Sequence, residues 1–155
     1  MKTLIMLSAV PASGKSTWAK EYQSTHPNTY IVNSDDIRME VTNGDYQDHS
    51  RQKEVWELFE KRIHEYGAIE NATVILDALN DVNEVRLKYL KSTPEFDKKI
   101  LVLFPNKLEK ARKYNNLREE TVRVPDNILV MLVDKFEAPS EEVLSLVDEV
   151  REVTW

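Results

Sequence analysis

The fold is decided by the stretch Leu4-Ile5-Met6-Leu7-Ser8-Ala9-Val10-Pro11-Ala12-Ser13-Gly14-Lys15-Ser16-Thr17. Its first four residues form an apolar run typical of a buried strand, and the run leads through a turn into Gly-Lys-Ser-Thr. This pattern predicts a strand, a phosphate-binding loop and a helix. The backbone N–H groups from about Ser13 to Thr17 would converge on an anion, and the helix would add the positive end of its dipole.

Side chains of the same loop suit a nucleotide with its metal ion. Lys15 can reach the β- and γ-phosphates of ATP, and the hydroxyl of Ser16 can ligate Mg²⁺. We expect Lys15 to be exposed while the loop is empty. The residues predicted to bind the nucleotide in this loop are Ser13, Gly14, Lys15, Ser16 and Thr17.

Two alanines depart from the usual form of the loop. Ala9 stands where the first glycine is expected, and Ala12 occupies a site where many kinases carry another. A positive φ at position 9 would cost on the order of 1 kcal/mol with alanine, which a folded domain tolerates. A chance occurrence of GKST is the competing interpretation. The apolar strand before it and the amphipathic helix after it, with Trp18 and Tyr22, favour the phosphate loop.

Composition indicates one globular domain over residues 1–155, with 41% apolar and 31% charged residues. The absence of cysteine excludes disulfides and thiolate metal sites. No apolar run approaches the roughly 20 residues of a membrane span, so we expect a cytoplasmic protein with no membrane partner. A net charge of −6 disfavours non-specific nucleic-acid binding but leaves a local basic groove open.

Strand and helix patterns alternate after the loop. Strands are predicted at 30–33, 73–77 and 99–104. Helices are predicted over 52–69, over 107–118 and from Pro125 onward. The end of the chain allows a helix or a short strand, and we expect the strand because the sheet needs a closing element. The alternation predicts an α/β fold of three layers, with a mostly parallel sheet and helices on both faces.

An acidic residue ends the predicted strand at 73–77. The run of β-branched and apolar residues is consistent with a strand buried on both faces, and Asp77 stands at its carboxyl end. There Asp77 can orient the Mg²⁺ shell, directly or through water. Capping of the next helix explains an aspartate at this position equally well.

Two more carboxylates, Asp35 and Asp36, come directly after the strand at 30–33. If Asp36 starts a helix, Ser34 or Asp35 caps it, and Arg38 lies within one turn of Asp35. Asp35 and Arg38 could then address one pocket. Capping alone also explains the two carboxylates.

A cationic segment with Arg118 and Arg123 separates two predicted helices. In an α/β kinase such a segment is typical of a lid over ATP, whose arginines stabilise charge on the transferred phosphoryl group. A solvated turn is the competing interpretation. Three residues near the start of the helix predicted at 52–69 could touch a substrate, although we favour a solvated face for them: His49, Arg51 and Lys53.

The motifs, taken in order, resemble the kinase domain of phage 5′-polynucleotide kinase. The matching elements are Gly14-Lys15-Ser16-Thr17-Trp18, Asn33-x-Asp35-Asp36-x-Arg38, the strand ending at Asp77, Asn115-x-x-Arg118 and Val124-Pro125. The run Phe136-Glu137-Ala138-Pro139, with Glu141-Glu142, also resembles kinase domains of bacterial end-healing enzymes.

This resemblance implies a P-loop kinase with a helical lid that transfers a phosphoryl group from ATP to a hydroxyl. It implies that Asp35 is the general base, that Arg38 orients Asp35 or a phosphate of the acceptor, and that Arg118 is the lid arginine. The sequence departs from the family pattern at Ala9, at Ala12, at Tyr114, where a basic residue is frequent, and by one extra residue between Arg118 and Pro125.

The resemblance makes the 5′-hydroxyl end of DNA or RNA the expected acceptor. Similar kinases also phosphorylate small metabolites, nucleotide sugars and hydroxymethylated pyrimidines in phage DNA, so a kinase for a small metabolite, a nucleoside or such a base is the alternative. A non-catalytic ATP-binding switch is a second alternative. Asp35 argues against the switch, which would need a water-positioning residue there. An open basic channel beside Asp35 would favour nucleic acid, and a closed pocket a metabolite.

Overall fold

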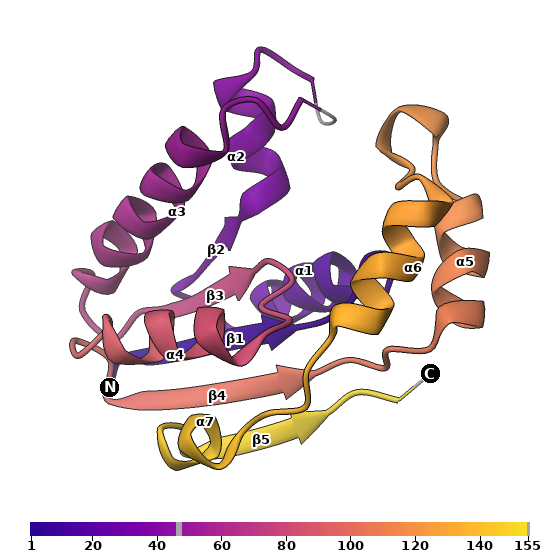
Figure 1. The fold of residues 1–155 in the computed structure, drawn as a ribbon. Coiled ribbons are helices and arrows are strands. Elements are labelled where there is room, and N and C mark those ends of the chain that lie inside the picture. Colours follow the sequence, from indigo (N-terminus) through magenta and orange to yellow (C-terminus); the bar gives the residue numbers. More distant parts are fainter. Residues whose placement is uncertain (46–47, 155) are drawn as a thin grey trace.

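The computed structural model describes residues 1–45 and 48–154. Its five strands form one all-parallel sheet in the order β2-β3-β1-β4-β5 (Figure 1). They are β1 (Thr3–Ser8), β2 (Thr29–Asn33), β3 (Thr73–Asp77), β4 (Lys98–Leu103) and β5 (Glu149–Glu152). The predicted α/β fold with a parallel sheet is confirmed, and the arrangement is that of a P-loop NTPase. The expected closing strand is β5, which pairs with β4.

Helices connect the strands. They are α1 (Lys15–Thr25), α2 (Ser34–Val41), α3 (Gln52–Gly67), α4 (Asn83–Lys91), α5 (Leu108–Asn116), a 3₁₀ turn η1 (Glu120–Val122), α6 (Asp126–Lys135) and α7 (Glu141–Ser145). The helices predicted over 52–69 and 107–118 both end two residues early, because a turn of backbone hydrogen bonds closes each one after Gly67 and Asn116.

Residues that alternate along β1 belong to opposite faces of the sheet. Leu4 and Met6 pack in a core with side chains from α2, α3, α4 and α7, whereas Ile5 and Leu7 pack in a second core against α1. Because helices cover both faces, the three central strands, β3, β1 and β4, have apolar residues in succession and not only at alternate positions. The molecule therefore has the three predicted layers.

Helices α5 and α6 form a lid beyond the carboxyl ends of the strands (Figure 1). Val10, Ala111 and Leu129 form a small apolar core of their own there. Asn115 is buried, donates to the carbonyl of Val124 at 2.7 Å and accepts from its N–H at 3.0 Å. These two bonds join the end of α5 to the segment that enters α6. Among the described residues, no helix is both long and apolar enough to cross a bilayer.

Candidate active site

The phosphate-binding loop, or P-loop, connects β1 to α1. A positive φ occurs at Ala12 (60°) and Gly14 (89°) and not at Ala9. Ala9 is fully buried, and its N–H donates to the carbonyl of Leu79 at 2.8 Å. Ala9 therefore carries no free-energy cost from a positive φ. That cost arises at Ala12 instead, where it amounts to about 1 kcal/mol.

Lys15 is buried, with 6% of its surface exposed, although the sequence led us to expect an exposed side chain. Its Nζ lies 4.0 Å from Oδ1 of Asp77, at the end of β3. The Asp77 carboxylate supplies the negative charge beside which this ammonium group is buried. In the absence of a nucleotide, Asp77 is thus the counter-charge of Lys15.

The carboxylate of Asp77 also meets the residue predicted to ligate the metal. Oδ2 accepts from the hydroxyl of Ser16 at 2.9 Å and from the amide of Asn33 at 2.7 Å. Oδ1 is buried and accepts no hydrogen bond from any described residue. Mg²⁺ prefers oxygen ligands and keeps several waters beside nucleotide phosphates. The Ser16 hydroxyl and Oδ1 of Asp77, which accepts no hydrogen bond from the described residues, therefore fit a hydrated Mg²⁺ ion on one side.

Asp35 and Arg38 lie on α2 and line one large cavity. Nη1 of Arg38 donates to Oδ1 of Asp35 at 2.8 Å, and Nη2 donates to Oε1 of Gln52 at 3.1 Å. The helix is capped by Asn33, whose side chain accepts from the N–H of Asp36 at 2.9 Å. We had expected Ser34 or Asp35 to be the cap, and this was wrong because the helix begins earlier, at Ser34. The expectation that Asp35 and Arg38 address one pocket is confirmed.

Asp36 is exposed and lines neither of these two cavities. Partial burial of its carboxyl raises the pKa of Asp36, and the negative charge of Asp77 raises it further. The two adjacent aspartates therefore have different surroundings.

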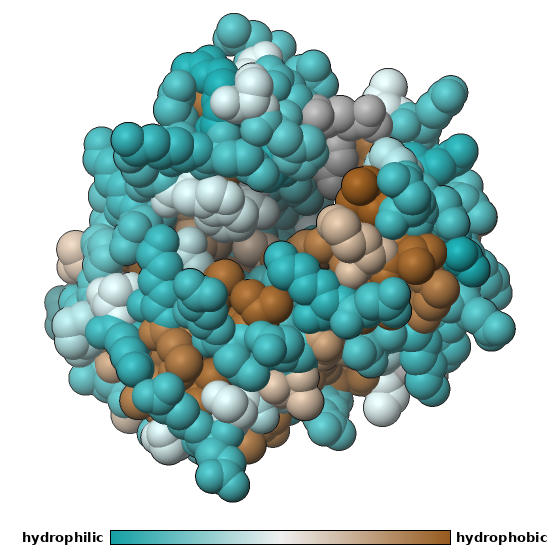
Figure 2. Space-filling view, viewed as in Figure 1, coloured by the Kyte–Doolittle hydropathy of each residue, from teal (hydrophilic) through white to brown (hydrophobic). Residues whose placement is uncertain are grey.

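The large cavity has a volume of about 820 Å³, within the range of sites for small molecules. Figure 2 shows the molecule hollowed between the side formed by α2 and α3 and the side formed by α6. Six lysines and arginines line the cavity against two aspartates, although the chain as a whole has a net charge of −6. The cations are Lys15, Arg38, Lys88, Arg118, Arg123 and Lys135. The cavity is thus the local basic groove that composition left open.

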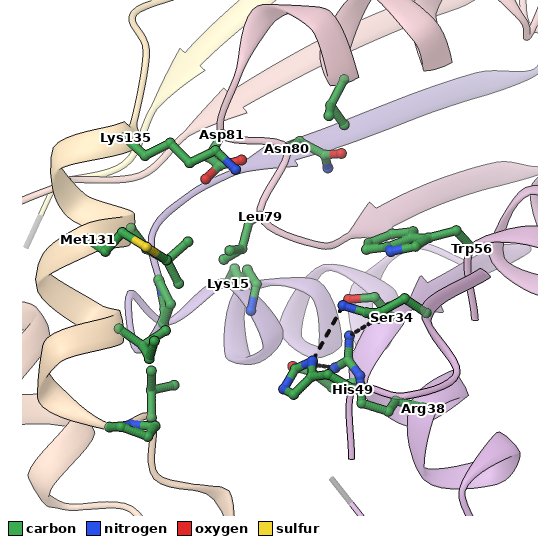
Figure 3. A pocket seen from close by; sticks show the side chains of 18 of the residues that line it. Lys15, Ser34, Arg38, His49, Trp56, Leu79, Asn80, Asp81, Met131 and Lys135 are labelled. Carbon is green, nitrogen blue, oxygen red and sulfur yellow. Dashed lines mark hydrogen bonds and ion pairs between the residues drawn. The ribbon is translucent and has the colours of Figure 1, made fainter. Parts of the chain in front are cut away.

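The remaining lining of the large cavity is mainly apolar. It comes from α3 and α4 on one side and from α6 on the other, with the β3–α4 loop between them (Figure 3). Its apolar members are Pro11, Trp56, Leu79, Val85, Tyr89, Val124, Pro125, Ile128, Met131 and Leu132. A flat, partly apolar group with charged substituents would fit these walls.

A second cavity, of about 480 Å³, lies over the P-loop. The five predicted loop residues line it together with Trp18, Phe104, Tyr114, Arg118 and Val153. Lys15 and Arg118 line both cavities, so the two cavities meet at these side chains. The structure therefore brings the predicted loop residues and the predicted lid arginine to one place.

Arg123, the second arginine predicted in the lid, does not line the cavity over the P-loop. Arg123 lines only the large cavity, and its Nη2 donates to the carbonyls of Asn116 at 3.2 Å and Arg118 at 2.9 Å. These bonds hold the backbone that carries Arg118. A contact between Arg123 and ATP stays a prediction.

The structure separates His49 from Arg51 and Lys53, the other two residues singled out near the start of α3. His49 is exposed and lines the large cavity beside Arg38 (Figure 3). A contact between His49 and a substrate stays a prediction. Arg51 pairs with Glu54, and Lys53 is exposed. For these two residues the solvated face is confirmed.

Arg86, on α4, is a functional-site neighbour that the sequence analysis missed. It is fully buried, and its guanidinium donates to the hydroxyl of Ser8 at 2.9 Å and to the carbonyls of Asn80 at 2.9 Å and Glu137 at 2.7 Å. Arg86 therefore joins the start of the P-loop, the β3–α4 loop and the segment after α6. The available signal was its spacing, four residues before the buried Leu90 on the same helical face.

Comparisons with known proteins agree with this geometry. A family model described as an AAA domain, AAA_33, matches residues 4–139. A chain of the Pnkp1/Rnl/Hen1 RNA repair complex is 24% identical with a TM-score of 0.75, over 86% of this chain and 43% of that one, so this chain spans less than half of it. A fungal RNA kinase is 13% identical with a TM-score of 0.65, over 99% and 75% of the two chains. A gluconokinase from Sinorhizobium meliloti 1021 is 16% identical with a TM-score of 0.62, over 99% and 83%.

At these identities the solved structures show a common fold, and the family rests on the model that spans most of the chain. The parallel sheet, the P-loop with its buried lysine and the lid that carries Arg118 all agree with that family. The chain belongs to the AAA domain family AAA_33 and is a P-loop kinase domain for ATP-dependent phosphoryl transfer.

Proposed function

We propose that the protein transfers the γ-phosphoryl group of ATP to the 5′-hydroxyl end of a nucleic acid. The observation that carries this proposal is that Lys15 and Arg118 line both cavities. A phosphoryl group between these two cations would face a nucleotide on one side and an acceptor on the other. Kinases of this kind work mainly by positioning and by stabilising charge at that point.

The donor binds over the P-loop. The loop N–H groups and the N-terminus of α1 receive the phosphates, and Lys15 turns from Asp77 to the β- and γ-phosphates. Ser16 and Asp77 are the residues that would hold Mg²⁺, and a bound ion would supply positive charge beside the phosphate oxygens. Arg118 approaches the γ-phosphate from the lid.

The acceptor binds in the large cavity, where Asp35 is the general base. The hydroxyl oxygen forms a bond to the γ-phosphorus, the bond from that phosphorus to the β–γ bridging oxygen breaks, and ADP leaves. The hydroxyl proton passes to Asp35 and then to water. Arg38 holds the Asp35 carboxylate at 2.8 Å and adds a positive charge for a phosphate of the acceptor.

A nucleic-acid end fits the large cavity in two respects. Its cations suit the phosphates of a strand, and its apolar side chains, with Trp56 and Tyr89 among them, suit a base. The fold similarity to an RNA kinase and to an RNA repair complex points the same way.

A kinase for a small metabolite, a nucleoside or a hydroxymethylated pyrimidine is the second candidate. It is favoured by the net charge of −6 and by the similar fold of a gluconokinase. A switch without an acceptor would leave Asp35 and the cavity beside it without a role.

A transfer assay with γ-labelled ATP tests the proposal. The acceptors are short DNA and RNA oligonucleotides with a free 5′-hydroxyl, the same oligonucleotides with a 5′-phosphate, and a panel of nucleosides, hydroxymethylated pyrimidine nucleotides and sugar acids. We expect label on the 5′-hydroxyl oligonucleotides and none on their phosphorylated counterparts. Labelling of a small alcohol or a nucleoside, with all oligonucleotides inert, would contradict it.

A further inference from the structure

One side chain of the large cavity has a hydrogen-bonding capacity that the proposed mechanism does not use. Asp81 lies in the loop between β3 and α4, lines the cavity and has 7% of its surface exposed. Its Oδ2 is buried, and its carboxylate accepts no hydrogen bond from any residue in the described part of the chain. A buried carboxylate without donors is unfavourable unless a ligand supplies them.

The nearest positive charges leave this carboxylate unpaired. Arg86 donates to the backbone carbonyl of Asp81 at 3.3 Å, and its other donors go to neutral oxygens. Lys135 lies beside Asp81 at the edge of the cavity (Figure 3), yet no ion pair joins them within the described chain. Asp81 and Glu137 act on Arg86 through space, since both raise the pKa of its guanidinium against the lowering effect of burial.

Asp81 lies across the large cavity from Arg38 and His49 (Figure 3). In Figure 3, Lys15 and Leu79 lie between Asp81 on one side and Arg38 with His49 on the other. If the reacting hydroxyl is near Lys15 and Asp35, a group on the opposite side of the acceptor reaches Asp81. Apolar side chains of α4 and α6 also line this cavity, among them Val85 and Met131.

We infer that Asp81 reads the terminal nucleobase of the acceptor by accepting hydrogen bonds from its N–H groups, and that it selects guanine; this inference rests on the proposed function. An ionised carboxylate only accepts hydrogen bonds, and its two oxygens match two parallel N–H donors. Guanine presents such a pair at N1 and the 2-amino group. Adenine and cytosine place an acceptor nitrogen beside their amino group, and uracil and thymine flank their single N–H with carbonyl oxygens. The same carboxylate repels sugar acids, which carry a negative charge of their own.

The experiment compares 5′-hydroxyl oligonucleotides that differ only in their first base, which is guanine, hypoxanthine, adenine or uracil. We expect kcat/KM for guanine to exceed that for adenine by about 5- to 150-fold, the range for a good bidentate contact. Hypoxanthine, which keeps the N1 donor and lacks the 2-amino group, should fall between them. Asp81→Asn keeps the shape and removes one acceptor oxygen, so it should abolish the preference for guanine.

Glu137→Gln is the matched control. It also removes a negative charge that acts on Arg86, but Glu137 lines neither cavity, and its Oε1 accepts only from the N–H of Asn83 at 2.8 Å. This variant should keep the guanine preference. Equal rates for the four bases in the wild type would overturn the inference. So would an equal loss with all four bases in Asp81→Asn, since that pattern indicates a structural role only.

A binding measurement separates this inference from the proposed function. Guanosine 3′-monophosphate should raise the melting temperature of the protein more than adenosine 3′-monophosphate does, and Asp81→Asn should remove the difference. This result would support the role of Asp81 even if no oligonucleotide is phosphorylated, in which case only the polynucleotide reaction is lost. Equal shifts with the two nucleotides would overturn the role of Asp81 whatever the transfer assay shows.

Discussion

Arg38 follows Asp35 by one turn of α2, and its Nη1 donates to Oδ1 of that carboxylate at 2.8 Å. Arg38 is itself 6% exposed and is held from its other nitrogen by Gln52 of α3. The carboxylate is thus positioned by two helices before any acceptor arrives. A substitution at either residue removes the partner that positions the other, so variants of this pair are best compared with neighbours outside the cavity.

Asp35→Asn should bind ATP normally and lose turnover by about 10²–10⁴-fold, because a general base contributes to the transition state and not to nucleotide affinity. Asp36→Asn is the control, since that residue lines neither cavity. Steady-state kinetics with a labelled acceptor measure both variants. A larger loss in Asp36→Asn would move the base to that residue.

Asp36→Asn should also affect stability in a pH-dependent way. The raised pKa means that the folded protein favours the neutral carboxyl, so the associated stability is present below the ordinary value of 3.8 and is lost as pH rises through the raised pKa. Above that pH the ionised Asp36 faces Asp77, and the variant should be slightly more stable than the wild type. Melting curves without Mg²⁺ at low and neutral pH measure the difference, and a gain confined to acid pH would contradict the expectation.

Lys15→Ala should remove nearly all phosphoryl transfer, because no other described ammonium group lines both cavities. The structure adds an expected loss of stability, since the buried Asp77 then has no cation at 4.0 Å. Lys20→Ala, on the exposed side of α1, is the control for turnover and should leave it unchanged. Wild-type turnover in a folded Lys15→Ala protein would refute the role of the P-loop.

Arg118→Ala should lower turnover by about 10³-fold or more, the range for an arginine that stabilises charge on a transferred phosphoryl group. Arg112→Ala removes a guanidinium from the outer side of the same lid, where it pairs with Asp126 at 2.9 Å, and should leave turnover unchanged. Single-turnover kinetics separate the chemical step from lid movement. A similar effect of the two substitutions would point to loosening of the lid.

Oligonucleotide affinity should fall with salt in proportion to the phosphates that the cavity neutralises. One or two contacts on a single strand give a log–log slope of about −0.7 to −1.4. Arg38→Ala should flatten the slope by about 0.7 and leave ATP affinity nearly unchanged. Arg51→Ala, outside the cavity and paired with Glu54, should keep the slope. A flat dependence in the wild type would favour a small acceptor.

The features that sequence analysis predicted are those set by local chemistry. The strand before the P-loop, the Gly-Lys-Ser-Thr helix start and the one-turn spacing of Asp35 and Arg38 each depend on residues close in the chain. The contact of Lys15 with Asp77 joins residues far apart in sequence, and only the pairing of β1 with β3 brings them together. The burial of Lys15 was therefore missed.

Arg86 and Asp81 show a second limit of the same kind. A charged residue on a short helix is normally exposed, so the fully buried Arg86 contradicts the usual preference and is explained by the backbone carbonyls that surround it. Those carbonyls belong to two distant segments. Asp81 lines the cavity together with residues of α6 that are far from it in the chain, and no spacing in the sequence specifies this arrangement.

The burial of Arg86 also limits how the lid can move. Its guanidinium binds Ser8 beneath the P-loop and Glu137 just beyond α6, and it lies 5.2 Å from the ring centre of Phe136. The segment after α6 is therefore joined through Arg86 to the end of β1, where the P-loop begins. A movement of α5 and α6 relative to the sheet would therefore pivot beside Arg86, so that the large cavity would change shape while the P-loop would keep its own.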